Sequence, residues 1–320
     1  MDNATHLLTS LGVAALGQNI PLIKEEDTRK AVFWAAVAGS QIPDLDVIYR
    51  LKSELAYLEF HRGFSHSFPS LIVIPVLVTV ILGLFFPRLS KPLVLLVTFA
   101  STLLHILLDL LTSYGTQFLW PLSDKRLGWD ILMIIDPFIL FVCAAALVVG
   151  KKSKISPVKI FSTMFGIIGL YILLRTGIHH KAFIMVNNKY ETEKYRLVSV
   201  LPGFGLSQWD YILDPYDKRK PIIVGYVNVR EGKVIEKHQF LAATGPVVDA
   251  AAKVPVGRVF TKFARHPLAI VKETKTGYLV TWTDLRYRYQ NHHPFTASVQ
   301  LNKDLKLLNS GLGRKFTYEE

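Results

Sequence analysis

The sequence predicts an N-terminal all-α polytopic membrane bundle, with about four spans plus a short N-terminal helical hairpin, followed by a smaller strand-rich soluble domain. Half of the 320 residues are hydrophobic and only 19% are charged, and the mean hydropathy is +0.30, which is unusual for soluble domains of this size. The long apolar runs end before residue 179, where shorter runs with period-two alternation begin. We therefore expect a membrane-embedded domain over residues 1–178 and a soluble domain over 179–320, which disfavours a purely cytosolic enzyme.

Four apolar runs in the first part have the length and composition of membrane-spanning helices. They cover residues 68–86, 92–111, 131–149 and 158–174. A helix of about 20 residues, rising about 1.5 Å per residue, crosses the roughly 30 Å core of a bilayer. Two N-terminal runs, 4–17 and 31–39, are shorter, so they predict re-entrant, interfacial or buried helices that can pair as a hairpin.

The short loops between these runs carry the charges that predict orientation. Arg88 and Lys91 lie between the first and second runs, and four lysines lie within residues 151–159, between the third and fourth. Four successive spans place both loops on one side, which the positive-inside rule makes the cytoplasmic side. We expect Asp109 and the whole chain after residue 174 on the extracytoplasmic side.

The second part predicts strands from runs of alternating β-branched and aromatic residues. The clearest runs are 221–229, 233–240, 277–283 and 295–301. Residues 181–320 hold 22 Lys and Arg against 13 Asp and Glu, so most of the net charge of +12 lies here. A basic face towards anionic lipid headgroups and a merely solvated surface both agree with this charge. Because the chain is so apolar, membrane lipid is the expected partner and nucleic acid is not.

Any metal must be held by histidines and carboxylates, because a single cysteine, Cys143, cannot build a cysteine site. The candidate ligands are His6, Asp44, Asp46, His61, His66, His105 and Asp109. On a helix, His105 and Asp109 lie one turn apart on the same face, so they can hold one divalent ion together. Ionisable groups at membrane depth usually face the bundle interior with a partner or an ion. A purely structural hydrogen bond between the two is the alternative.

Three aspartates lie next to or close to prolines in the sequence. Asp44 and Asp46 follow Pro43 and alternate with leucine, so in an extended segment or turn both carboxylates can project to one side and hold a metal. Capping of a following helix is the alternative for this pair. Asp136, directly before Pro137, is expected to cap the third apolar helix.

A histidine-rich patch precedes the first apolar run. His61 and His66 are five residues apart, a spacing that a regular helix would split, but Gly63 lets the backbone bend so that both rings can converge. Arg62 between them could clamp a phosphoryl oxygen with its planar fork. Ser67 is expected to bond a ligand histidine or to cap the next helix, since nothing around it indicates a nucleophile.

Taken in order, these motifs resemble the YdjM/YbcI-type family of bacterial membrane-bound, metal-dependent hydrolases, which includes a LexA-binding, inner-membrane-associated member. The motifs are Thr5-His6 with Gly12, Pro43-Asp44-Leu45-Asp46, His61-Arg62-Gly63 with Ser65-His66-Ser67, and His105-x-x-x-Asp109-x-x-Thr112-x-Tyr114-Gly115-Thr116. They cover roughly the first 180 residues, and several motifs in the right order are more specific than any one of them. The resemblance implies a hydrolase whose substrate is undefined. The His-x-x-x-Asp pair also resembles that of zinc-dependent phospholipases C, which suggests phosphoesters.

The sequence thus predicts an integral membrane hydrolase that uses a divalent metal, with Zn²⁺ expected, to activate water against a phosphoester or other ester. Asp44 or Asp46 would accept the proton, and Arg62 would stabilise the developing negative charge. Lipid, including anionic lipid, is the expected substrate class, because it can diffuse laterally to a site at headgroup level. The alternatives are an ion or proton pathway, and a membrane-anchored, partner-binding protein with a structural metal; no protein partner is indicated.

Overall fold

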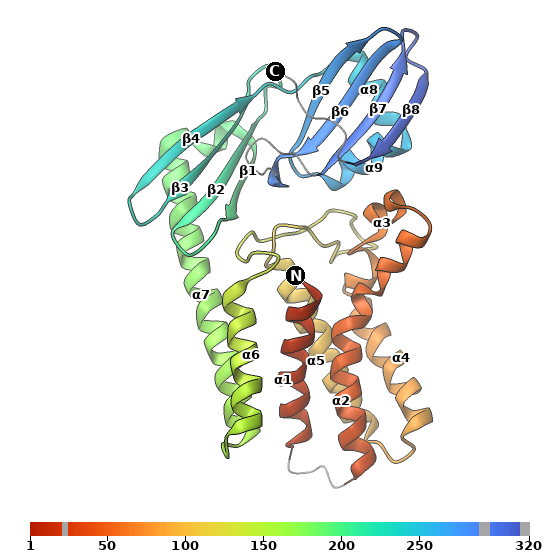
Figure 1. Ribbon diagram of the computed structural model, residues 1–320, viewed down its shortest axis with the longest axis vertical. Coiled ribbons are helices and arrows are strands. Elements are labelled where there is room, and N and C mark those ends of the chain that lie inside the picture. The colour runs from red at the N-terminus through yellow and green to blue at the C-terminus, as the bar shows by residue number, and fades with distance from the viewer. Residues whose placement is uncertain (21–24, 288–294, 314–320) are drawn as a thin grey trace. The chain divides into compact units, whose positions relative to one another are not determined.

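A computed structural model describes residues 1–20, 25–287 and 295–313 of the chain (Figure 1). The chain divides into two compact units. The first, here called the helical unit, comprises Met1–Ile48 and Phe60–Gly177, and the second, the strand unit, comprises Tyr49–Glu59 and Ile178–Glu320. No sequence pattern indicated that Tyr49–Glu59 would group with the strand unit.

The helical unit is built from helices that lie side by side (Figure 1). In chain order the elements of the first 190 residues are α1 (Asn3–Gln18), α2 (Glu26–Gln41), the 3₁₀ segment η1 (Ile42–Leu51), α3 (Glu54–Phe60), η2 (Phe64–His66), α4 (Ser70–Phe85), α5 (Lys91–Leu110), α6 (Pro137–Lys152) and α7 (Pro157–Tyr190). The end of η1, most of α3 and the last part of α7 belong to the strand unit. The two short N-terminal runs form α1 and α2, which pack through small buried residues such as Ala14, Ala31 and Ala35. The predicted N-terminal pair of helices is therefore present.

The helical unit holds fewer clear membrane spans than the four that the sequence predicts. Among the described residues, α5 and α7 are long and apolar enough to cross a bilayer; α4 adds a third only if it forms one bent span with Glu54–His66, at an angle of 79°. α4 and α6 have 16 residues each, about 24 Å at about 1.5 Å per residue, which is less than the roughly 30 Å hydrocarbon core. The structure thus supports two to three spans, and residues 131–136, expected within a span, lie outside any helix.

The start of α6 explains why the third predicted span is short. Asp136 caps the helix, as predicted, and its carboxylate accepts hydrogen bonds from two backbone N–H groups of the first turn. The same carboxylate accepts the hydroxyl of Tyr171 on α7 at 3.2 Å, and Arg175, also on α7, donates to the carbonyl of Ile131 at 2.7 Å. These α7 side chains satisfy polar groups of the segment before α6, so that segment need not be helical to be buried.

α2 and α5 approach each other unusually closely, and this contact sets the position of His105. A Cβ added at Gly39 would lie 2.6 Å from the carbonyl oxygen of Thr98, so only glycine fits there without a shift. Thr102 donates to the carbonyl of Gly39 at 3.0 Å. One turn further along α5, His105 Nδ1 lies 2.6 Å from the carbonyl oxygen of Ser40. The end of α2 therefore holds the ring of His105 in place.

The strand unit contains two four-stranded antiparallel sheets, ordered β1-β2-β3-β4 and β5-β6-β7-β8 (Figure 1). The elements are β1 (Tyr195–Pro202), β2 (Gln208–Pro215), β3 (Ile222–Asn228), β4 (Lys233–Phe240), α8 (Pro246–Lys253), α9 (Pro255–Phe263), β5 (Pro267–Thr274), β6 (Gly277–Asp284), β7 (Thr296–Asn302) and β8 (Leu307–Leu312). The four runs predicted as strands form β3, β4, β6 and β7. β2 was not among them because its last five residues are all buried, which removes the alternation that marks a half-buried strand.

The first sheet packs against the C-terminal part of α7, which continues well beyond residue 174, the end expected from its apolar run. Ala182 and Val186 of the helix meet Trp209 and Tyr211 of β2 in one buried core. The two sheets share a second core through Leu201, Ile212, Ile222, Val224, Leu268 and Leu285. The strand unit therefore has an apolar core of its own, separate from that of the helical unit.

Candidate metal centre

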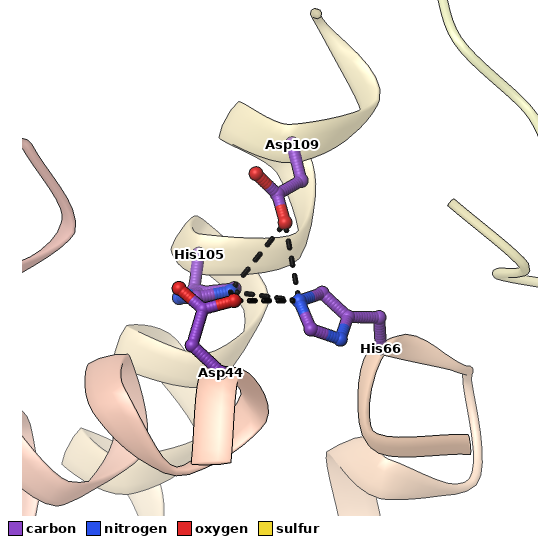
Figure 2. A group of neighbouring side chains, drawn as sticks. All are labelled: Asp44, His66, His105 and Asp109. Carbon is purple, nitrogen blue, oxygen red and sulfur yellow. Dashed lines mark hydrogen bonds and ion pairs between the residues drawn. The ribbon is translucent and has the colours of Figure 1, made fainter. Parts of the chain in front are cut away.

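Three segments of the helical unit bring four predicted ligands together. Asp44 comes from η1, His66 from η2, and His105 and Asp109 from the last turns of α5 (Figure 2). One ligand atom from each of the four lies within 4.8 Å of the others. His66 Nε2 lies 3.3 Å from Asp44 Oδ1 and 3.2 Å from Asp109 Oδ2, and His105 Nε2 lies 3.5 Å from Asp109 Oδ2. We call Asp44, His66, His105 and Asp109 the first ligand group.

The hydrogen bonds of the two rings fix which nitrogen faces the group. His105 Nδ1 donates to the carbonyl of Ser40, because a carbonyl only accepts. The hydroxyl of Ser65 donates to the Asp46 carboxylate at 3.0 Å, so Nδ1 of His66, 2.9 Å from that hydroxyl, must be the donor to it. Both Nε2 atoms, 3.1 Å apart, then present lone pairs to each other and to the carboxylates.

The first ligand group fits a divalent cation. The side chains of His66, His105 and Asp109 are fully buried, that of Asp44 is 10% exposed, and Asp109 Oδ2 has no hydrogen-bond partner. Buried acceptors that face one another without a donor are costly unless a positive charge offsets them. Ligands about 2.0–2.1 Å from a tetrahedral Zn²⁺ lie about 3.3 Å from one another, close to the observed 3.1–3.8 Å.

A second ligand group consists of Asp44, Asp46 and His61. Asp46 Oδ1 lies 2.7 Å from His61 Nδ1, and Asp46 Oδ2 accepts the backbone N–H of Arg62 at 2.9 Å. Burial alone would raise the pKa of Asp46, but the hydrogen bond and charge of His61 and the backbone N–H of Arg62 hold that pKa below its ordinary value. Asp46 is thus an ionised carboxylate with both oxygens engaged, as in carboxylates that orient ligand histidines. Asp44 belongs to both groups.

Arg62 lies against a ligand, with its guanidinium buried. Its side chain is 3% exposed and pairs with Asp109 Oδ1 at 2.8 Å, while the guanidinium carbon lies 4.5 Å above the ring of Tyr114. Its backbone is left-handed, with φ of 57°, a conformation that costs of order 1–3 kcal/mol for a residue with a side chain. The guanidinium of Arg62, which was expected to bind a phosphoryl oxygen, therefore pairs with Asp109.

The chain turns between His61 and His66. Arg62 is the left-handed residue of this turn, and Gly63 has φ of −91°. Glycine is required at position 63 by close approach, since an added Cβ would lie 2.8 Å from the carbonyl oxygen of Phe60. The two histidine rings lie 6.0 Å apart between centroids and enter different ligand groups.

His6 lies beside the first ligand group and belongs to neither group. Its ring stacks on that of His105, with centroids 3.7 Å apart, and its Nε2 lies 3.3 Å from Asp109 Oδ1. The backbone nitrogen of Met1 also contacts Asp109 Oδ1. Asp109 is therefore where the first ligand group, His6 and Arg62 meet.

Several residues that shape the site were not predicted. Ser65 bonds both Asp46 and His66. Ser67, expected to bond a ligand histidine or to cap the next helix, donates to the carbonyl of Phe64 at 2.7 Å, and α4 has no side-chain cap. The carbonyl of Ser40 and the ring of Tyr114 were also missed. Ser65 and Tyr114 stand within the motifs, so closeness in sequence to the ligands was all that could have indicated their role. Nothing in the sequence indicated that the carbonyl of Ser40 would contact a ligand.

Comparison with known proteins agrees with this geometry. The family model described as YdjM inner membrane protein matches residues 1–181, more than half of the chain and all of the ligands. The chain belongs to the YdjM inner membrane protein family. The predicted resemblance is therefore confirmed.

Further similarities extend over the rest of the chain. A second family model, the YfhP C-terminal alpha/beta plait domain, matches residues 246–320. The chain is 28% identical over 327 aligned residues, 100% of its length, to 97% of the uncharacterized protein YfhP of Bacillus subtilis. It is 34% identical over 115 residues to the inner membrane protein YbcI of Escherichia coli, covering 34% of this chain and 65% of YbcI. No solved structure matches the chain.

Proposed function

We propose that this protein is an integral membrane, metal-dependent hydrolase that acts on a phosphoester or ester. The observation that carries the proposal is the first ligand group, in which two imidazole nitrogens and two carboxylate oxygens converge in a buried position without a donor among them. Structural hydrogen-bond networks pair acceptors with donors, so this arrangement indicates a cation. Membership of an inner membrane protein family and the apolar helices α5 and α7 support membrane insertion.

Zn²⁺ is the ion that we propose for the site. Imidazole and carboxylate ligands in equal number suit Zn²⁺, which takes four ligands of these types at short distances. A divalent ion held here would supply Lewis acidity, which activates water and polarises an ester or phosphoester.

We assign different roles to the three predicted catalytic residues. Asp44 is the member of the first ligand group with the most exposed side chain and is shared with the second group, so we propose that it accepts the proton of the attacking water. Asp46, with both oxygens engaged, positions His61 and His66. Arg62 places a permanent positive charge beside Asp109, where it holds that ligand and lowers the energy of negative charge that develops in the reaction.

Lipid is the substrate class that we propose. The ligands of α5 lie at the end of an apolar helix, where an amphiphile can reach them by lateral diffusion. The net positive charge of residues 181–320 favours anionic headgroups or phosphoesters over neutral substrates.

We further propose that all four apolar helices are embedded in a bacterial inner membrane, with the ligands and the strand unit on the extracytoplasmic side. The loops at Arg88–Lys91 and Lys151–Lys159 lie at the end of the helical unit opposite to His105 (Figure 1), and their charge favours the cytoplasm. An alkaline phosphatase fused after Gly313 should be active and a green fluorescent protein at the same point dark. The reverse result would put the ligands in the cytoplasm.

A structural metal in a membrane-anchored binding protein is the second candidate. It is favoured by the near-complete burial of four protein ligands, because catalytic zinc sites usually keep one position open. A proton pathway has less support, since the described residues of α4 and of α5 before His105 offer only hydroxyl groups and the lysine that begins α5.

The test is to purify the full chain in detergent, measure bound metal by mass spectrometry, and assay phosphomonoesters, phosphodiesters, carboxylic esters and anionic phospholipids. We expect bound zinc, and turnover that a chelator abolishes and zinc restores. Stoichiometric metal without turnover of any substrate would favour the structural alternative. Absence of metal after reconstitution with Zn²⁺ would contradict the assignment of the site.

A further inference from the structure

An apolar groove lies between α6 and α7, at the end of the helical unit away from the first ligand group. Its volume is about 350 Å³, within the roughly 300–1,000 Å³ of small-molecule sites. Its lining is apolar except for one threonine and one lysine: Phe141, Val142, Ala145, Ala146, Val149, Ile155, Lys159, Ile160, Thr163, Met164 and Ile167. The floor is buried, with Met164 2% exposed, while rim residues such as Phe141 are 70% exposed. The groove is therefore open along the side of the helix pair.

One end of the groove is strongly basic. Lys159 lines it, and Lys151, Lys152 and Lys154 precede it in the connection between α6 and α7. The sequence has no aspartate or glutamate between Asp136 and Glu191. Within the described parts of the chain, none of these four lysines forms an ion pair with a protein carboxylate. Lys159 thus places a positive charge at one end of the groove, three further lysines stand nearby in the chain, and α6, α7 and their connection supply no counter-charge.

Two of the three acidic residues at the start of α2 have partners close by. Asp27 accepts the backbone N–H of Arg88 at 3.2 Å, and Glu26 pairs with Lys30 at 3.5 Å. Asp27 and Glu26 therefore do not serve as counter-charges for the lysines near the groove.

We propose that this groove binds an anionic phospholipid, with one acyl chain between α6 and α7 and the phosphate beside Lys159. An apolar groove with a cationic end matches a ligand with an apolar chain and an anionic head. Each lysine near an anionic headgroup adds roughly 1 kcal/mol of attraction, and the phosphate also offsets the unfavourable position of Lys159 in the first turn of α7, where the helix dipole is positive. Free phosphate has no apolar chain to occupy the groove, and a neutral lipid has no net negative charge to pair with the lysines.

This site is distinct from the metal centre. His105 and Asp109 lie near the C-terminal end of α5, whereas Lys91 begins that helix. The connection between α6 and α7, which carries the lysines, lies at the end of the helical unit where α5 begins (Figure 1). The bound lipid would be a structural or regulatory ligand, and the proposal holds whether or not the metal centre is catalytic.

The test is native mass spectrometry of the full chain in detergent, titrated with phosphatidylglycerol or phosphatidylcholine of the same acyl chains. We expect a first phosphatidylglycerol to bind at least several-fold more tightly than phosphatidylcholine. Lys159→Gln should weaken phosphatidylglycerol about fivefold and leave phosphatidylcholine unchanged. Lys91→Gln, which alters charge at the same end outside the groove, is the matched control and should bind like the unmodified chain.

A second variant tests the groove itself. Thr163 lines the groove and is exposed, so Thr163→Trp should fill the channel without disturbing the buried floor, and should abolish tight binding of the first phosphatidylglycerol. Unchanged metal content would verify that the variant is folded. Equal affinity for both lipids, equal weakening by Lys91→Gln and Lys159→Gln, unchanged binding in Thr163→Trp, or full competition by inorganic phosphate would each overturn the proposal.

Discussion

Buried histidines occur in both units of this protein, and their surroundings are opposite. In the helical unit, His66 and His105 face two carboxylates and each other, all as acceptors. In the strand unit, His266 is fully buried, and its Nε2 lies 2.8 Å from the hydroxyl of Ser199, which also accepts from Arg265 at 2.8 Å. In the first arrangement four acceptors converge, whereas in the second Nε2 of the ring lies beside a hydroxyl and Nδ1 has no hydrogen-bond partner.

The carboxylates show the same contrast. In the strand unit, Asp284 is paired with the buried Arg286 at 2.6 Å, and Asp214 contacts both Arg196 and Lys218. In the helical unit, Asp109 meets one arginine through Oδ1 while Oδ2 has no hydrogen bond. Burial of polar side chains is therefore not by itself a sign of function. An unmatched excess of acceptors is the feature that separates the candidate metal site from a structural network.

The largest expected effect is loss of metal on removing a ligand. His105→Ala and Asp109→Ala should each abolish stoichiometric zinc binding, because these side chains supply two of four converging ligand atoms. The equivalent change in the strand unit, His266→Ala, should leave the metal content unchanged. Mass-spectrometric metal analysis of the detergent-purified proteins measures this, with membrane insertion as a check. Full occupancy in either ligand variant would remove that residue from the site.

The next effect concerns the buried ion pair of the strand unit. Arg286→Met leaves the fully buried Asp284 without its partner, which should destabilise this unit by about 3–5 kcal/mol. Arg219→Met removes an exposed partner of Asp217 and should cost far less stability, because water screens an exposed pair.

Urea unfolding followed by tryptophan fluorescence can compare these two variants, because Trp209 and Trp282 are buried within the strand unit. Similar losses of stability in both variants would show that burial does not increase the contribution of the Asp284–Arg286 pair to stability.

A smaller effect is expected at Asp46. If this carboxylate orients His61 and His66 without binding the ion, Asp46→Asn should weaken zinc affinity by about 10–100-fold and still allow full occupancy at high zinc. Asp217→Asn is the exposed control and should not change the affinity. Competition with a zinc-chelating dye gives the constants. Complete loss of metal in Asp46→Asn would instead make Asp46 a direct ligand.

The smallest effect is a pH dependence of the strand unit. Burial, reinforced by the charges of Arg265, Arg286, Arg196 and Lys218, holds the pKa of His266 well below its ordinary value of 6.5. The unfolded chain therefore takes up a proton below about pH 6.5 that the folded chain does not, so the free energy of unfolding should fall with acidification by up to about 1.4 kcal/mol per pH unit.

His266→Gln should remove this part of the slope between pH 7 and pH 5, and the other titrating groups act equally in both proteins. Urea unfolding of the two proteins at each pH measures the difference. Identical slopes would show that His266 is protonated in the folded state or accessible to solvent.

Part of the site could be predicted because its signals are local. The spacing of His105 and Asp109 places them on one helical face, and the structure brings His105 Nε2 within 3.5 Å of Asp109 Oδ2. The β-hairpin at residues 230–232 and the strands on either side follow from alternation and turn residues in the same way. The cap at Asp136 is a third case, since its partners are the next backbone N–H groups.

Other features depend on contacts between distant parts of the chain. Asp44 and Asp46 look equivalent in the sequence, but the fold turns Asp44 to the first ligand group and engages Asp46 with His61 and Ser65. The sequence did not indicate that His266 would be buried beside Ser199, because the two residues are 67 positions apart. The helix of the third predicted span is shorter than its apolar run, because hydropathy does not register that side chains of α7 support a non-helical segment before α6.

The sequence by itself determined the ligand types, the family, the two-part division into helices and strands, and the helical face shared by His105 and Asp109. Each of these follows from composition, from motif order, or from periodicity within a few turns of chain. Only the tertiary structure decided which ligands converge, that Arg62 contacts Asp109, and that His266 Nε2 lies beside the hydroxyl of Ser199. Hydrogen bonds and ion pairs require atoms within about 3–4 Å of each other, and such distances between residues far apart in the chain are set by the packing of whole elements.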